Sequence, residues 1–168
     1  MSDIYIFGNS PKCNTTAILE GNSHIVVLGL GINHITNRKI NYWVTRPAKY
    51  NAESQKKTDK TIIISKEKNV DVCEYISNKS NYETLELCKQ YNIKLKTYPT
   101  LGLFSILYFK QFYSRVYVTG ISTNIYDRSS NSGYFWDIGK KLCDVHEDVL
   151  SETIVMSRMV KNKEIYEF

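Results

Sequence analysis

The sequence predicts a Rossmann-like three-layer α/β/α sandwich with a mostly parallel sheet. Short runs of continuously apolar residues alternate along the chain with helical segments, which is the pattern of strands buried on both faces. Glycine-containing turns directly follow several of these runs, at residues 8–10, 31–33 and 120–122. In open sheets of this class the ligand lies beyond the carboxyl ends of the strands, so these turns are candidate binding segments.

The composition is that of a globular protein. The 168 residues, 42% of them hydrophobic, suffice to bury a core without a disulfide or a structural metal, and they predict a single domain over 1–168. The formal net charge of +5 comes from scattered lysines and arginines rather than from a basic stripe, so we expect no nucleic-acid partner. The 13 tyrosines suit surfaces that meet sugars, bases or phosphates, although most of them fall in predicted strands and helices.

The sequence predicts a cytoplasmic protein. No apolar run reaches the roughly 18 residues that a membrane-spanning helix needs, and the first residues do not form a signal peptide. Peripheral association with a membrane and the oligomeric state both stay open.

Four strands are predicted in the first half of the chain. Each is an apolar run that ends near Gly, Pro or polar residues, and they span residues 4–7, 25–28, 42–44 and 61–64. The polar, lysine-rich segment 48–60 is expected to be a loop.

The second half alternates helices with strands. Helices are expected at 67–77, 81–91, 101–113 and 148–160, and strands at 93–96, at 116–118 and, as an edge strand, at 164–168. The helix over 101–113 is apolar on all sides, which predicts a buried helix. For the last helix we expect Val149, Ile154 and Val155 to face inward.

The turn Gly8-Asn9-Ser10 follows the first strand. It lacks the further glycines of a dinucleotide fingerprint and the Lys-Ser/Thr of a P-loop, so neither an NAD site nor a P-loop ATP site is expected. Glycine lets the backbone approach a ligand closely, and asparagine offers both a donor and an acceptor. Asn33 is the corresponding residue after the second strand, and an ordinary turn is the alternative at both places.

Thr100 is placed to cap the buried helix that starts with Leu101 and Gly102. The N-terminus of a helix offers N–H groups and the positive end of the helix dipole, which suits a phosphate or a carboxylate. A cap without any ligand is the alternative.

Two further candidates lie near the end of the chain. Tyr126 and Tyr134 flank a segment rich in Ser, Asn and Gly, from which two phenol hydroxyls could close over a phosphate; an ordinary surface loop is the alternative. His146 precedes the last helix and could accept a proton from a sugar hydroxyl; a structural histidine is the alternative.

In this order, the motifs resemble the CMP-sialic acid-dependent sialyltransferases. Residues 98–121, with Pro-Thr-Leu-Gly opening an apolar helix and a strand ending in glycine, are similar to the small sialyl motif of the animal-type enzymes. Residues 121–134, with two tyrosines after that strand, resemble the small bacterial type, and His146 with Glu152 resembles the family's His…Glu element.

The resemblance implies a role for each candidate residue. Asn9 and Asn33, with the turn Gly8 and Ser10, would contact the donor's phosphate and sugar-linked oxygens. The other implied donor-binding residues are Thr100, Leu101 and Gly102. Tyr126 and Tyr134 would stabilise the departing phosphate in place of a metal ion, and His146 would be the general base.

The implied activity is the transfer of sialic acid, or a related acid sugar, from a CMP-linked donor to a hydroxyl of a glycan acceptor. The transfer would invert the anomeric carbon and need neither a metal nor another cofactor. Two departures from the family pattern support an alternative, a nucleotide-sugar or glycan-binding module with impaired catalysis. Leu101 replaces a small or hydroxyl residue, and the lid over about 121–145 is reduced.

Overall fold

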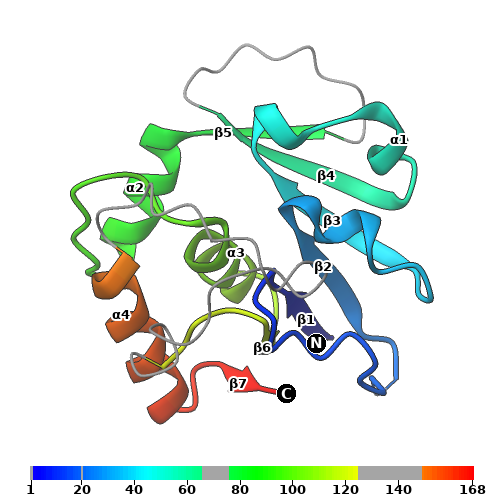
Figure 1. Ribbon diagram of the computed structural model, residues 1–168. Helices are drawn as coiled ribbons and strands as arrows, with labels where there is room; N and C mark the ends of the chain where they lie inside the picture. The colour runs from blue at the N-terminus through cyan, green and yellow to red at the C-terminus, as the bar shows by residue number, and fades with distance from the viewer. Residues whose placement is uncertain (1, 20, 66–75, 125–148) are drawn as a thin grey trace.

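The computed structural model of the chain describes residues 2–19, 21–65, 76–124 and 149–168. Within these ranges one sheet contains seven strands in the order β5-β4-β3-β2-β1-β6-β7 (Figure 1). Every pair of neighbouring strands is parallel. The predicted Rossmann-like α/β fold is therefore confirmed, with a sheet that is parallel throughout the described residues.

Most of the apolar runs in the sequence form strands. The strands span Asp3–Phe7 (β1), His24–Leu28 (β2), Ile40–Thr45 (β3), Thr58–Ser65 (β4), Ile76–Ser80 (β5), Arg115–Thr119 (β6) and Tyr166–Glu167 (β7). The α-helices are Ala52–Gln55 (α1), Asn81–Gln90 (α2), Leu101–Lys110 (α3) and Val149–Lys161 (α4), and the 3-10 helices are Gly29–Asn33 (η1) and Pro47–Lys49 (η2).

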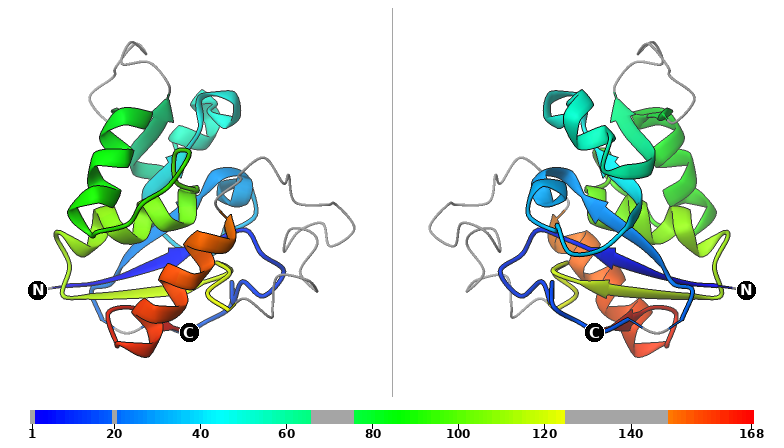
Figure 2. Two further views of the ribbon diagram at one scale, coloured as in Figure 1. Left: turned by 90° about the vertical axis from the view of Figure 1, so that its left-hand side faces the viewer. Right: turned by 90° about the vertical axis from the view of Figure 1, so that its right-hand side faces the viewer.

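The two faces of the sheet bury alternate residues of the strands. Ile4 and Ile6 of β1 join a core cluster with apolar side chains of α2, α3 and α4, which lie together on one face (Figure 2). Tyr5 and Phe7 point to the opposite face and pack with Ile32 of η1 and with coil segments. Because both faces are covered, the strands can be apolar at every position, which is why they read as continuous runs rather than as alternating ones.

Helix α3 is buried, as its sequence predicts. Seven of its residues from Gly102 to Phe109 are buried, and it packs against α2 and the central strands. The Thr100 hydroxyl accepts a hydrogen bond from the N–H of Leu103 at 3.3 Å and caps the helix. The helix ends at Lys110, three residues before the predicted end at 113.

The predicted strand at 93–96 is wrong. Helix α2 ends at Gln90, the chain then turns at Asn92, whose φ is 56°, and the N–H of Ile93 donates to the carbonyl of Cys88 at 2.9 Å. Ile93 is buried against the helical face of the sheet instead of joining a strand. The apolar residues of 93–96 therefore pack against the core just after the end of α2, as coil.

Three other expectations need correction. The predicted loop over 48–60 contains α1 and the start of β4, because Asn51 caps a short helix there by accepting from the N–H of Ser54. The end of the predicted helix over 67–77 belongs to β5, an edge strand with few apolar residues; 66–75 lie outside the described residues. Ile154 is 39% exposed and does not face inward, whereas Val155 packs against the core cluster as expected, beside the buried Met156 and Met159.

Candidate functional site

The turns after β1 and β6 meet at the centre of the sheet. β1 lies between β2 and β6. From β1 the chain first adds β2 to β5 on one side of the sheet and later adds β6 and β7 on the other side, so the carboxyl end of β1 is the topological switch point. The N–H of Gly8 donates to the carbonyl of Thr119 at 2.8 Å, and the N–H of Ser10 donates to that of Gly120 at 3.0 Å. A Cβ at Gly8 would lie 2.2 Å from the Gly120 oxygen, so this close approach requires glycine.

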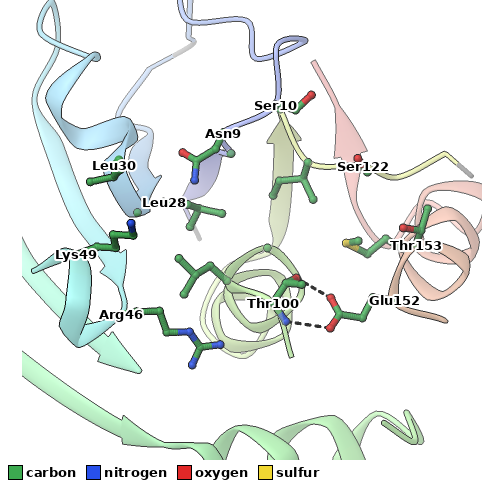
Figure 3. A pocket seen from close by; sticks show the side chains of 17 residues that line it. Asn9, Ser10, Leu28, Leu30, Arg46, Lys49, Thr100, Ser122, Glu152 and Thr153 are labelled. Carbon is green, nitrogen blue, oxygen red and sulfur yellow. Dashed lines mark hydrogen bonds between the residues drawn. The ribbon is translucent and has the colours of Figure 1, made fainter. Parts of the chain in front are cut away.

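A cavity of about 350 Å³ opens at this switch point (Figure 3). Its walls come from the turns after β1, β2, β3 and β6, from the start of α3 and from α4. The predicted donor-binding residues among its lining are Gly8, Asn9, Ser10, Thr100, Leu101 and Gly102. Segments that are distant in the sequence are thus brought to one cavity, of a size that suits a small-molecule ligand.

Asn9 presents a buried amide oxygen, Oδ1, that has no hydrogen-bond partner among the described residues. Its Nδ2 atom lies 3.2 Å from the position that a Cβ would take at Gly29, where φ is 50°. Gly29 therefore leaves room for the Asn9 amide, and the amide retains capacity for a ligand in the cavity.

Thr100 is tied to α4 by a carboxylate. Glu152, only 1% exposed, accepts from the N–H of Thr100 at 2.9 Å with Oε1 and from its hydroxyl at 2.6 Å with Oε2 (Figure 3). The same hydroxyl oxygen accepts from Leu103, so one side chain joins the cap of α3 to α4. This tie fixes the start of α3 at the cavity wall.

Arg46, which follows β3, holds the segment before α3 in place. Its Nη2 donates to the carbonyl of Pro99 at 2.8 Å, and its guanidinium lies 4.6 Å from the centre of the Tyr98 ring. Burial lowers the pKa of Arg46 from its usual value, while the neighbouring Tyr98 and Glu152 act in the opposite direction. The guanidinium supplies positive charge to the cavity wall through a side chain whose position is fixed.

The sequence reasoning did not name several of the lining residues individually, among them Arg46, Lys49 and Ser122. Arg46 and Lys49 stand just beyond the carboxyl end of a predicted strand, and Ser122 stands in a turn already singled out. The rule that singled out Gly8 could therefore have found all of them. Glu152 was noticed only as part of the His…Glu element, and nothing local indicated its contact with Thr100.

Not every predicted residue lies at the cavity. Asn33, at the end of η1, is exposed and its Oδ1 accepts from the Ser54 hydroxyl of α1 at 2.8 Å, so it lies away from the cavity lining. Tyr126, Tyr134 and His146 lie outside the described residues, as does most of the lid over about 121–145.

Membrane-spanning helices and metal-binding clusters are both absent from the described ranges. No helix in those ranges has the length and apolar character needed to span a membrane. Nor do they contain a group of three or more His, Cys, Asp or Glu residues placed to hold a metal ion.

Comparison with known proteins identifies the fold. No protein-family model and no curated protein matches the chain. A mammalian sialyltransferase, solved with Gal-beta-1-3GalNAc-ortho-nitrophenol, aligns with 99% of this chain and 69% of its own, at a TM-score of 0.65 and 13% identity. The sialyltransferase CstII from Campylobacter jejuni, solved with the substrate analogue CMP-3FNeuAc, aligns with 99% of this chain and 80% of its own, at a TM-score of 0.57 and 12% identity. The chain therefore has the fold of sialyltransferases.

Proposed function

We propose that this protein is a glycosyltransferase that moves sialic acid, or a related acid sugar, from a CMP-linked donor to a hydroxyl of a glycan acceptor. One observation carries the proposal. The turn after β1 and the start of α3, both singled out as donor-binding from the sequence, line a single cavity at the switch point of a sialyltransferase fold.

The chemistry of the cavity supports a nucleotide-linked, anionic ligand. Leu28, Leu30 and Leu101 provide apolar wall for a base or a sugar ring. Opposite charge is available from Arg46, and the first turn of α3 presents N–H groups that have no acceptor within the helix. The unpartnered Asn9 oxygen can accept from a ligand hydroxyl or amine.

The ligands of the related folds support the same class of substrates. CstII was solved with an analogue of a CMP-linked sugar and the mammalian enzyme with a disaccharide glycoside. By analogy, the donor here carries CMP and the acceptor is a glycan.

The catalytic roles follow from the sequence resemblance. In the proposed step, an acceptor hydroxyl oxygen bonds to the anomeric carbon from the face opposite CMP, and the bond from that carbon to the phosphate oxygen breaks with its electrons leaving on CMP. His146 accepts the hydroxyl proton. Tyr126 and Tyr134 donate hydrogen bonds to the departing phosphate, so that no metal or other cofactor is needed.

The test separates binding from chemistry. Calorimetry should detect CMP binding, and incubation with CMP-sialic acid and a panel of glycans should yield a sialylated product. His146→Ala should abolish transfer while the CMP dissociation constant stays within about twofold, because a general base acts in the transition state rather than in ground-state binding.

The paired variant Tyr126→Phe/Tyr134→Phe should lower the transfer rate strongly, whereas Tyr82→Phe, at an exposed position of α2, should not. Full turnover in His146→Ala would remove that residue as the base. Absence of any binding to CMP would overturn the proposed donor.

A catalytically impaired binding module is the second candidate. Leu101 favours it, because an apolar side chain lines the cavity where the resembling family has a small or hydroxyl residue. CMP binding without turnover on any acceptor of the panel would support this candidate.

A further inference from the structure

Arg46 and Lys49 line the cavity as cations, and their surroundings differ. Besides Pro99, Arg46 contacts Asn81 through Nη1, with 3.3 Å between Nη1 and Oδ1, and its guanidinium stacks on Tyr98. The guanidinium of Arg46 therefore contributes positive charge to the cavity wall, but its Nη1 and Nη2 donors are used on protein groups. The lining carboxylate, Glu152, likewise uses both of its oxygens on Thr100.

Lys49 is an uncommitted cation at the cavity. It is exposed, and within the described parts of the chain its amine forms no ion pair and no hydrogen bond. In Figure 3 its side chain lies on the same wall as Arg46 and Leu30. An ammonium group in this position is available to a ligand.

The backbone that carries Lys49 is held firmly. Pro47 begins η2, and the N–H of Lys49 donates to the carbonyl of Arg46 at 2.9 Å. The next residue, Tyr50, stacks on Trp43 with ring centres 5.9 Å apart, and the Trp43 indole donates to the carbonyl of Gly29 at 2.7 Å. These contacts fix the backbone of Lys49 beside the turn after β2, from where its side chain lines the cavity.

We propose that Lys49 determines the preference of this cavity for an anionic ligand, by pairing its ammonium with an oxyanion of the CMP-linked donor. The proposal rests on the proposed function and adds the specificity-determining residue. The oxyanion is the phosphate or the sugar carboxylate, which present the same chemistry to a lysine. The partial positive charge at the start of α3, which the Glu152 carboxylate offsets in part, acts in the same direction.

Calorimetry with CMP-sialic acid, which carries both oxyanions, and with uncharged cytidine tests this proposal. Lys49→Met should weaken CMP-sialic acid binding roughly five- to twentyfold, as expected for a charge-assisted contact, and leave cytidine binding unchanged. Lys49→Arg should restore most of the loss. The matched control is Lys56→Met, which removes the same charge from an exposed position outside the cavity and should leave both affinities unchanged.

The donor itself distinguishes the two oxyanions. An equal loss for CMP and for CMP-sialic acid in Lys49→Met assigns the contact to the phosphate. A loss confined to CMP-sialic acid assigns it to the carboxylate. If Lys49→Met binds both ligands as the unaltered protein does, the proposal is overturned while the CMP donor stands; if the unaltered protein binds neither, it is the proposed function that fails.

Discussion

The tie between Thr100 and Glu152 uses a property that only a carboxylate has. Two donors of Thr100, its N–H and its hydroxyl, each meet a separate oxygen of one buried side chain. Glutamine has the same shape but only one accepting oxygen, so one Thr100 donor would face an NH₂ group. A buried donor left without an acceptor costs free energy.

We therefore expect Glu152→Gln to lower the free energy of unfolding by about 2 kcal/mol, measured by urea denaturation. Glu53→Gln, an exposed acid in α1, is the matched control and should change it by less than about 0.5 kcal/mol. Adding Thr100→Val to Glu152→Gln should cost less than the sum of the single changes, because the two residues share one contact. Additive costs would contradict the coupling.

Whether a cavity residue could be predicted depends on how far its interaction partners lie from it in the sequence. Gly8, Asn9 and Thr100 could be predicted because the end of a strand or the start of a helix is visible in a few neighbouring residues. The structural roles of Arg46 and Glu152 could not be predicted, because their partners Pro99 and Thr100 lie 53 and 52 residues away in the sequence. No local pattern encodes such a pairing.

At the scale of elements, helix α2 shows how a polar start fixes a boundary. Ser80 and Glu83 form a capping box, in which the Ser80 hydroxyl accepts from the N–H of Glu83 and the Glu83 carboxylate accepts from the N–H of Ser80 at 2.7 Å. Ser80 is also the last residue of β5, so the same residue ends a strand and starts a helix.

Ser80→Ala should lower the free energy of unfolding by about 1 kcal/mol, because an N–H at the start of the helix loses its acceptor. Ser80→Thr, which keeps the hydroxyl as both acceptor and donor, should restore most of that loss. The CMP affinity should be the same in both variants, since Ser80 is not part of the cavity lining. Equal stability of Ser80→Ala and the unaltered protein in urea denaturation would contradict the role of the cap.

Helices and strands that are fully buried could be predicted from the sequence, whereas elements at the edge of the sheet or only partly buried were harder to predict. Helix α3 and the central strands are apolar throughout, so their sequences indicate both their type and their burial. The edge strand β5 has little apolar pattern, and residues 93–96 have a strand-like pattern but pack as coil. In both cases the conformation is set by packing against neighbours in space rather than by the local secondary-structure propensity.

At the scale of the whole molecule, the strand order creates the site. Parallel strands alone predict that the turns meet at one edge, which is how the cavity could be anticipated. The position of β6 beside β1 was not predictable from local sequence, because it depends on which strands pair across more than a hundred residues. That pairing sets the turns after β1 and β6 against each other.

The apolar cores on both faces of the sheet disfavour charged groups, and the pKa values of two buried thiols show this. Cys13 packs in the core cluster opposite the helices, and Cys88 packs in the cluster beneath them. Burial raises the pKa of Cys13 to about 12, with Arg38 acting in the opposite direction. Burial, followed by the charge of Glu152, raises the pKa of Cys88 to about 12.

The stability of the folded protein should therefore fall as the pH rises above about 8.5. An unfolded chain releases its thiol protons near that pH, whereas the folded protein keeps them until about pH 12, so folding binds protons and is favoured at lower pH. Urea denaturation from pH 7.5 to 9.0, where the thiols of the unfolded chain titrate and tyrosine and lysine have barely begun to, measures the slope. Cys13→Ser/Cys88→Ala should show a shallower slope whatever its absolute stability, since neither replacement titrates there while Cys73 and Cys143 remain in both proteins. Parallel slopes would mean that the thiolates are accommodated inside the folded protein.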